Sequence, residues 1–255
     1  MDKRIVNDDI KSKNIESKEC LILYADIMGF KNMVYNLTHD ELKERLENFT
    51  SCWKNRISPL LKGGYLKSVQ FSDSIIMIVD GIEKKMFNLI SKAAICLIQE
   101  AMKVKFPIKG VIAQGIFSFS SERELYFGKP LVDAYLLHEE LKYYGIVVHN
   151  TAEKTVKRFR GKDKPYKNTP IFLEKSKISH YHLCWNLVDE TLSPKDITNK
   201  CEKWLHNIEE LVSGYPRIYI DNTLKVLKKD SKQNHSRKFR THSPQSLTST
   251  RPHSS

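Results

Sequence analysis

Hydrophobic positions near the start of the chain predict a buried strand that ends at an acidic residue. Residues 21–25 form an uninterrupted apolar run, which is typical of a buried strand, and Asp26 follows directly. Gly29 allows a tight turn of the main chain, and residues 30–37 then take up a helical pattern. The Asp26 carboxylate is therefore expected at a strand end, beside main-chain N–H groups that suit a metal-bound phosphate.

A second apolar pattern predicts a hairpin with another carboxylate at its tip. Residues 65–71 and 74–79 are rich in β-forming side chains, and only Ser72 and Asp73 separate them. If this hairpin pairs with the first strand, Asp26 and Asp73 reach one place. Hard divalent ions take oxygen ligands, commonly carboxylates and substrate phosphates, so the two residues are candidate metal ligands. Taken alone, each Asp is more often a structural residue, Asp26 as a helix cap and Asp73 as a turn residue.

The remaining pattern up to residue 150 predicts an α+β fold. Helical spacing of apolar residues indicates helices from Thr38 or Asp40 onward, over 83–103 and over 128–141. Residues 108–119 alternate like a strand, with two glycines that leave room for a ligand or a second backbone, or that mark a bulge. This order fits a ferredoxin-like antiparallel sheet with helices on one face.

The chain is expected to divide into four parts. Residues 1–17 form a charged N-terminal segment, residues 18–150 a catalytic domain, residues 151–227 a C-terminal extension or subdomain, and residues 228–255 a disordered basic tail. The extension contains a basic loop at 154–167 and a strand at 181–188, followed by two helices. The tail is rich in Ser, Thr, His, Gln and Pro, and it has too few large apolar residues to fold alone.

Composition limits the other classes of function. The formal net charge of +12 is concentrated at the C-terminus, where residues 225–255 hold eight Lys or Arg residues against one acidic residue. Such a tail binds nucleic acid or anionic lipid weakly, so nucleic acid is an improbable main partner. The five cysteines have no CxxC spacing, which supports neither a disulfide framework nor a zinc knuckle. With no membrane-length apolar run and no signal peptide, the sequence predicts a soluble cytoplasmic protein.

Two segments resemble a known superfamily. YADIMGF and QFSDSIIMIV place Asp26 and Asp73 47 positions apart, and they resemble the class III nucleotide cyclases, whose metal-binding aspartates sit at a strand end and on a following hairpin. The resemblance continues through Leu141 and implies the palm fold of those enzymes. It also implies two Mg²⁺ or Mn²⁺ ions per active site, held by Asp26, Asp73 and the carbonyl group of Ile27.

The same resemblance suggests where the triphosphate binds. The expected donors are the main-chain N–H groups of Ile27, Met28, Gly29 and Phe30. The superfamily's transition-state Asn and Arg correspond by spacing to Val132 and Leu136. Basic residues from a partner chain or from the 154–167 loop are the candidates to replace the Arg.

The base-reading positions differ from those of purine cyclases. They correspond here to Val69 and Leu125, and neither side chain can hydrogen-bond to a purine edge. Tyr24 lies two residues before Asp26 and is expected on the same face of the strand, where its ring would shorten the base pocket. Its alternative role is that of an ordinary aromatic residue in the core.

Within the superfamily, the YxDxxGFK opening, the QFSDSI hairpin and the GKPLVDAYLLHEEL helix resemble the pyrimidine cyclases of the bacterial Pycsar anti-phage systems. This resemblance implies a homodimer that converts UTP, or secondarily CTP, to the 3′,5′-cyclic nucleotide and pyrophosphate, and so activates a separate effector. The alternatives are a purine nucleotide cyclase and a catalytically silent nucleotide-binding regulator.

Overall fold

One mixed sheet of eight strands organises the protein. The computed structural model describes residues 15, 17–161, 165–188 and 191–240, with side chains described to residue 232. The strands are β1 (Ser17–Ile27), β2 (Leu66–Phe71), β3 (Ser74–Asp80), β4 (Ile108–Ser120), β5 (Leu125–Phe127), β6 (Ile146–Val148), β7 (Tyr166–Phe172) and β8 (Lys177–Leu183). Their order is β2-β3-β1-β4-β6-β8-β7, with β5 paired to β4. The β4–β6 pair is parallel, and the other named pairs are antiparallel.

Seven helices accompany the sheet in the described part of the chain. They are α1 (Phe30–Asn36), α2 (His39–Leu61), α3 (Lys84–Lys103), α4 (Lys129–Glu140), α5 (Asn150–Phe159), α6 (Pro194–Glu209) and α7 (Pro216–Arg240). The α+β class and the central hairpin are thus confirmed. Among the described residues, no helix is both long and apolar enough to cross a lipid bilayer.

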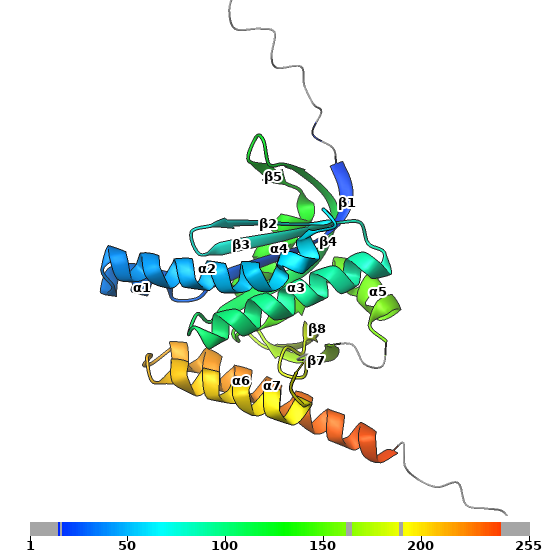
Figure 1. Cartoon of the computed structure of the whole chain (residues 1–255). Coiled ribbons are helices and arrows are strands. Elements are labelled where there is room, and N and C mark those ends of the chain that lie inside the picture. Colours follow the sequence, from blue (N-terminus) through cyan, green and yellow to red (C-terminus); the bar gives the residue numbers. More distant parts are fainter. Residues whose placement is uncertain (1–14, 16, 162–164, 189–190, 241–255) are drawn as a thin grey trace, which may run out of the picture.

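Helices cover both faces of the sheet, so the prediction of helices on one face was wrong. In Figure 1, α2 and α3 lie in front of the strands and α4 lies behind them. The reason is visible in β1, where Leu21 and Leu23 belong to the core under α3 while Ile22 belongs to a second core with Ala134 of α4. Successive strand residues point to opposite faces, so an uninterrupted apolar run requires cover on both sides.

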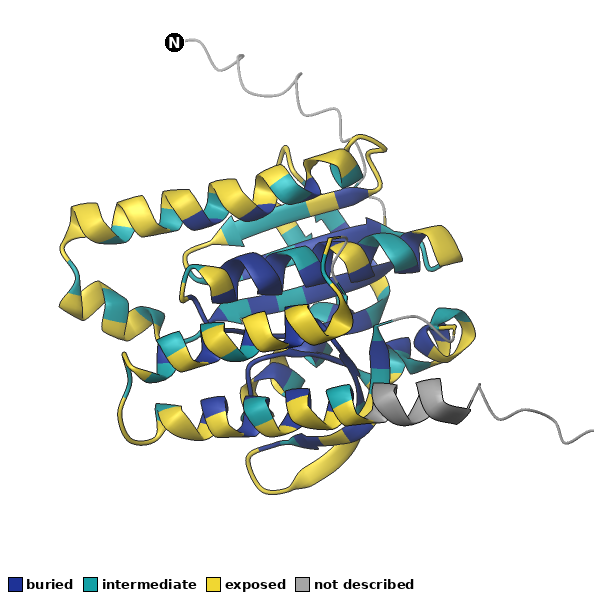
Figure 2. Ribbon diagram, turned by 60° about the horizontal axis from the view of Figure 1, so that its bottom comes forward, coloured by how far each residue is buried: buried dark blue, intermediate teal, exposed yellow. Residues whose placement is uncertain are grey.

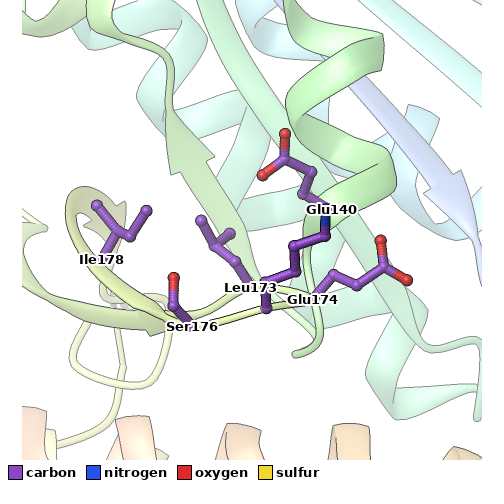
Figure 3. Close-up of a pocket in the computed structure, with 6 residues that line it drawn as sticks. Glu140, Leu173, Glu174, Ser176 and Ile178 are labelled. Carbon is purple, nitrogen blue, oxygen red and sulfur yellow. The ribbon is translucent and has the colours of Figure 1, made fainter.

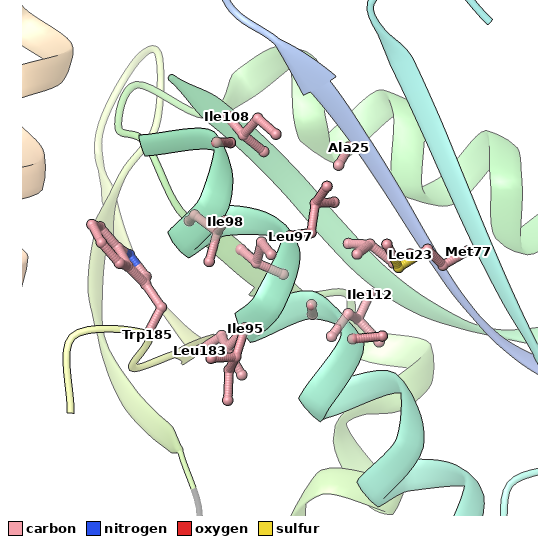
Figure 4. Close-up of a cluster of buried hydrophobic side chains, with 14 of the residues drawn as sticks. Leu23, Ala25, Met77, Ile95, Leu97, Ile98, Ile108, Ile112, Leu183 and Trp185 are labelled. Atoms are coloured by element: carbon pink, nitrogen blue, oxygen red, sulfur yellow. The ribbon is translucent and has the colours of Figure 1, made fainter. Parts of the chain in front are cut away.

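The larger core lies between α3 and the sheet. Figure 4 shows Leu97 and Ile98 of α3 facing Leu23 of β1 and Ile112 of β4. Each of these side chains is at most 2% exposed, and full burial of such a side chain contributes about 1.5–3 kcal/mol. This packing fixes β1 and β4 as the rigid centre of the sheet. Figure 2 shows the same division, with buried residues along the inner sides of the helices and exposed residues outward.

The structure decides between two alternatives left open by the sequence, the first residue of α2 and the role of Gly115 in β4. Thr38 is the N-cap of α2 and forms a capping box with Glu41, whose main-chain N–H donates to Thr38 Oγ1 at 3.3 Å. Gly115 serves packing, because a Cβ atom there would lie 3.3 Å from the ring of Pro130 at the start of α4. The glycine in β4 therefore allows a helix to approach closely.

Residues after 150 extend the same sheet. Strand β8 pairs with β6 through Val147 and His182, and α6 packs against α3. The segment predicted as a basic loop at 154–167 is not all loop, since α5 (Asn150–Phe159) includes residues 154–159 and β7 begins at Tyr166. The strand predicted at 181–188 is observed four residues earlier, as β8.

The basic C-terminal segment begins as part of the folded protein. Helix α7 continues to Arg240, and Asp230 within it is 0% exposed. The tail was predicted to be disordered from residue 228, but helix α7 continues through this position, and the burial of Asp230 shows that the chain packs here despite its polar composition. Residues 241–255, and the N-terminal segment up to residue 14, lie outside the described residues.

Candidate active site

The pairing of β1 with the β2–β3 hairpin brings the two predicted aspartates together. Asp26 of β1 lies directly opposite Ser74 of β3, and Ser72 and Asp73 form the two-residue turn before Ser74. The N–H group of Ile27 donates to the main-chain carbonyl of Asp73 at 3.1 Å. The hairpin tip is thus tied to the end of β1, and both carboxylates lie at one end of the sheet.

A chain of hydrogen bonds orients Asp26. Ser74 Oγ donates to Asp26 Oδ1 at 3.0 Å, and the Tyr24 hydroxyl bonds to Ser74 Oγ at 3.2 Å. Because the Ser74 hydrogen is used by Asp26, Tyr24 is the donor in the second bond. Tyr24 therefore lies on the same face as Asp26, as its spacing predicted.

The electrostatics of Asp26 suit a cation ligand. Burial, followed by the negative charge of Asp73, raises the pKa of Asp26 from 3.8 to about 6, although the Ser74 hydrogen bond and the positive charge of Lys109 oppose this shift. Two carboxylates that repel each other in a partly desolvated place gain most when a positive ion binds between them. The oxygen donors of Asp26 and Asp73 fit Mg²⁺ or Mn²⁺. The carbonyl of Ile27, which follows in the same strand, stays a predicted third ligand.

The structure shows no helix-capping role for Asp26. The N-cap of α1 is Gly29, with a left-handed φ of 78° and no side-chain hydrogen bond. Of the four predicted triphosphate donors, Ile27 N–H already bonds to Asp73 and Met28 N–H bonds to the Pro107 carbonyl at 2.8 Å. The N–H groups of Gly29 and Phe30 are therefore the remaining candidates from that set.

Lys109 is a basic residue beside the aspartates that the sequence pattern did not reveal. It lies directly opposite Asp26 on β4, so both side chains point to one face. Lys109 is only 4% exposed, and burial lowers its pKa while Glu139 raises it. In the sequence, Lys109 is recognisable only as the second residue of a predicted strand. Its position beside Asp26 follows only from the β1–β4 register.

The three predicted base-pocket residues do not meet within one chain. Val69 pairs with Ile76, which pairs with Tyr24, so Val69 and Tyr24 share a row across the sheet. Leu125 pairs with Ser120 at the far end of β4, eleven residues from Lys109. Eleven residues span roughly 35 Å along a strand, and Figure 1 shows β5 beside the start of β1. Leu125 is therefore remote from the aspartates of its own chain.

Helix α5, which holds residues 154–159 of the predicted basic loop, does not lie on the face of Asp26 either. Ala152 and Val156 of α5 pack in the core under α3, on the face opposite to Asp26. Val132 and Leu136, at the positions of the superfamily's Asn and Arg, are 56% and 59% exposed on α4. Within one chain, Lys109 is thus the basic side chain that the sheet places beside Asp26.

A separate cavity lies away from these residues. It has a volume of about 340 Å³ and lies between Glu140 at the end of α4 and the turn from β7 to β8 around Ser176 (Figure 3). Neither Asp26 nor Asp73 lines it. The candidate site at the end of β1 is therefore separate from this cavity.

Comparison with known proteins identifies the fold. No protein-family model and no curated protein sequence matches the chain. The structure of a bacterial light-regulated adenylyl cyclase is similar with a TM-score of 0.51 at 13% identity, covering 76% of this chain and 59% of that one. A second structure of a bacterial light-regulated adenylyl cyclase has a TM-score of 0.50 at 14% identity, covering 73% of this chain and 99% of that one. The protein therefore has the fold of the class III nucleotide cyclases.

The pKa of Asp26 leads to a first prediction. Because the folded protein holds this proton up to about pH 6 and the unfolded chain only to about 3.8, the metal-free protein loses stability as the pH rises from about 4 to 6. Asp26→Asn keeps an acceptor for Ser74 and removes the charge. We expect it to stabilise the metal-free protein by about 1–2 kcal/mol at pH 8 and by nothing at pH 4.

Thermal unfolding in EDTA at both pH values measures this difference. Added Mn²⁺ should raise the melting temperature of the wild type and leave Asp26→Asn unchanged, since only the wild type keeps both carboxylates. A variant that is less stable than the wild type at pH 8 would show that Asp26 has a structural role.

Proposed function

We propose that this protein is a nucleotide cyclase, which joins the ribose 3′-hydroxyl of a nucleoside triphosphate to its α-phosphorus and releases pyrophosphate. The observation that carries the proposal is the convergence of Asp26 and Asp73 at one end of a sheet with the class III cyclase fold, where burial and then the charge of Asp73 raise the pKa of Asp26. A carboxylate whose pKa is raised by burial together with a specific charged neighbour is a candidate functional residue.

Each residue at the sheet end has a defined role in this proposal. Asp26 and Asp73 hold the divalent ions, and Ser74 keeps the Asp26 carboxylate in place. Bound Mg²⁺ or Mn²⁺, two per active site, lowers the pKa of the 3′-hydroxyl and neutralises the leaving pyrophosphate. The N–H groups of Gly29 and Phe30 bind the triphosphate, and Lys109 adds positive charge beside Asp26.

We further propose that the substrate carries a pyrimidine, with UTP preferred to CTP. Val69 and Leu125 offer no polar group to a purine edge, and Tyr24 shares a face of the sheet with Asp26 and a row with Val69. The resemblance to the Pycsar cyclases supports this choice, and it implies that the cyclic product is a second messenger of anti-phage defence that activates a separate effector.

The proposed active form is a two-fold homodimer. Leu125 lies at the opposite end of β4 from Asp26, so a pocket that uses both residues needs two chains. Exposed apolar residues on α4, namely Val132, Tyr135 and Leu136, recur on one helical face and offer a surface for the contact. A symmetric dimer would complete two equivalent sites at once.

Product analysis tests the function directly. The purified protein is incubated separately with ATP, GTP, CTP and UTP in the presence of Mn²⁺, and the products are identified by mass spectrometry. Cyclic UMP as the main product supports the proposal. A cyclic purine product would keep the cyclase assignment and contradict the pyrimidine assignment.

Replacing Tyr24 tests whether its ring limits the size of the base. We expect Tyr24→Ala to reduce the preference for UTP over ATP by about tenfold, which is the range for changes in pocket size. Tyr24→Phe keeps the ring and loses only the bond to Ser74, so its preference should stay near that of the wild type. An unchanged preference in Tyr24→Ala would make Tyr24 a core residue that packs on Tyr135 and His138.

The absence of Asn and Arg at positions 132 and 136 favours a second candidate, a nucleotide-binding regulator without turnover. Such a protein would bind a metal–nucleotide complex through Asp26 and Asp73 and give no cyclic product with any of the four nucleotides. A nucleic-acid-binding role of the basic tail is tested by deleting residues 233–255, which removes four of its eight Lys or Arg residues and keeps the buried Asp230 of α7. A cyclase keeps its turnover after this deletion, whereas a nucleic-acid binder loses affinity and its salt dependence.

A further inference from the structure

Three potential metal ligands meet where the C-terminal helix crosses the sheet. His182 lies on β8, Cys184 follows two residues later, and Asp230 lies on α7. Their ligating atoms all lie within 4.8 Å of one another. Each of the three residues is at most 1% exposed, so the cluster is enclosed by the protein.

The distances between these atoms are close to those around a tetrahedral ion. Cys184 Sγ lies 3.7 Å from His182 Nε2, and the same nitrogen lies 2.9 Å from Asp230 Oδ2. Bond lengths to zinc place neighbouring ligand atoms about 3.3–3.6 Å apart. An ion would therefore fit after the His182–Asp230 pair separates by about half an ångström.

Two buried polar atoms beside the cluster have no hydrogen-bond partner among the described residues. One is Asp230 Oδ1, and the other is the hydroxyl oxygen of Tyr143. Tyr143 is buried, and it lies near enough to Asp230 and Cys184 for electrostatic interaction with both. Buried polar groups without partners are rare and costly, so the pair indicates that a further group belongs here.

The ring of His182 is held in a suitable orientation. Its Nδ1 atom lies 3.3 Å from the hydroxyl of Thr169 on β7, which leaves Nε2 for the cluster. Histidine ligands commonly bond through the second nitrogen to a neighbouring group, and this contact fixes the ring.

We propose that His182, Cys184 and Asp230 bind one divalent transition-metal ion, with Zn²⁺ the preferred species. A set of one sulfur, one nitrogen and one carboxylate oxygen favours zinc over Mg²⁺ or Mn²⁺. The second oxygen of Asp230 or the hydroxyl of Tyr143 is available as a fourth ligand. The ion would join α7 to β8 and so fasten the C-terminal helix to the sheet.

The charges determine which ligands the ion needs. A cysteine that coordinates an ion does so as a thiolate, and its negative charge offsets part of the charge of the ion. Lys167 donates a hydrogen bond to the main-chain carbonyl of Asp230, and its positive charge opposes a nearby cation. Both anionic ligands, the Cys184 thiolate and the Asp230 carboxylate, are therefore required.

Metal analysis of the full-length protein tests the proposal. After expression with added zinc and extensive dialysis, we expect about one tightly bound zinc ion per chain. Cys184→Ser should reduce the zinc content at least about fivefold, because a neutral hydroxyl replaces a thiolate. Cys201→Ser is the matched control, since Cys201 is equally buried on α6 and lies outside the cluster. Asp26→Ala should also keep its zinc, which separates this site from the catalytic one.

Cobalt provides a measurement that needs no variant. Wild-type protein refolded with Co²⁺ should show the absorption of a cobalt–thiolate bond, and Asp230→Asn should weaken it. Wild-type protein with neither bound zinc nor this absorption would overturn the proposal and leave a metal-free hydrogen-bonded cluster. Full zinc content in Cys184→Ser would also overturn it. Cyclase activity is not read in either experiment, so the outcome is independent of the proposed function.

Discussion

Replacing Asp26 or Asp73 with alanine is expected to abolish cyclic-nucleotide formation in a protein that still folds. Each change removes one oxygen ligand of the proposed metal site, and a site that stabilises developing charge commonly loses about 10²–10³ in rate when one such group is removed. Neither residue belongs to the hydrophobic core, and both are partly exposed. The folded structure should therefore survive, with a melting temperature close to that of the wild type.

Asp80→Ala provides the control for this experiment. Asp80 ends the same strand β3 at its other end and pairs with Lys18 at 2.9 Å. A partly exposed ion pair of this kind contributes about 0–1 kcal/mol, so its loss should leave turnover unchanged. Turnover is measured as cyclic product per enzyme at saturating Mn²⁺, and folding by circular dichroism. A folded Asp26→Ala protein with wild-type turnover would exclude the metal assignment.

The strand end and the hairpin could be predicted because their signals are local. The apolar run before Asp26 and the two-residue turn at Ser72 and Asp73 each lie within about ten residues of sequence. The structure adds the β1–β3 register, which places Ser74 opposite Asp26 and so explains how a hairpin delivers the second carboxylate.

Other features depend on contacts between distant residues and therefore escaped prediction. Lys109 reaches Asp26 only through the β1–β4 register, and α4 covers the second face because odd and even residues of β1 belong to separate cores. The cluster of His182 and Asp230 joins residues 48 positions apart. The spacing of the cysteines could not predict this cluster, since Cys184 is its only cysteine.

A charge on the exposed face of α4 is expected to separate the proposed dimer and remove most of the activity. Leu136 is 59% exposed beside Val132 and Tyr135, and a glutamate there would be buried without a partner in a dimer that uses this face. Disruption of a central contact costs on the order of 2–4 kcal/mol, which corresponds to about 30-fold to 10³-fold in dimer affinity. Turnover at micromolar protein should fall accordingly, because each site would lose the part of the base pocket that the second chain supplies.

Leu211→Glu is the matched control for this change. Leu211 is 60% exposed in the turn after α6, so the same substitution adds the same charge away from α4. We expect Leu211→Glu to remain dimeric and active, whereas Leu136→Glu sediments as a monomer that still binds Mn²⁺ through Asp26 and Asp73. Raising the concentration of Leu136→Glu should recover part of the lost turnover, since mass action restores the dimer. A Leu136→Glu protein that is monomeric and fully active would show that one chain holds a complete site, and Leu125 would then have no part in the base pocket.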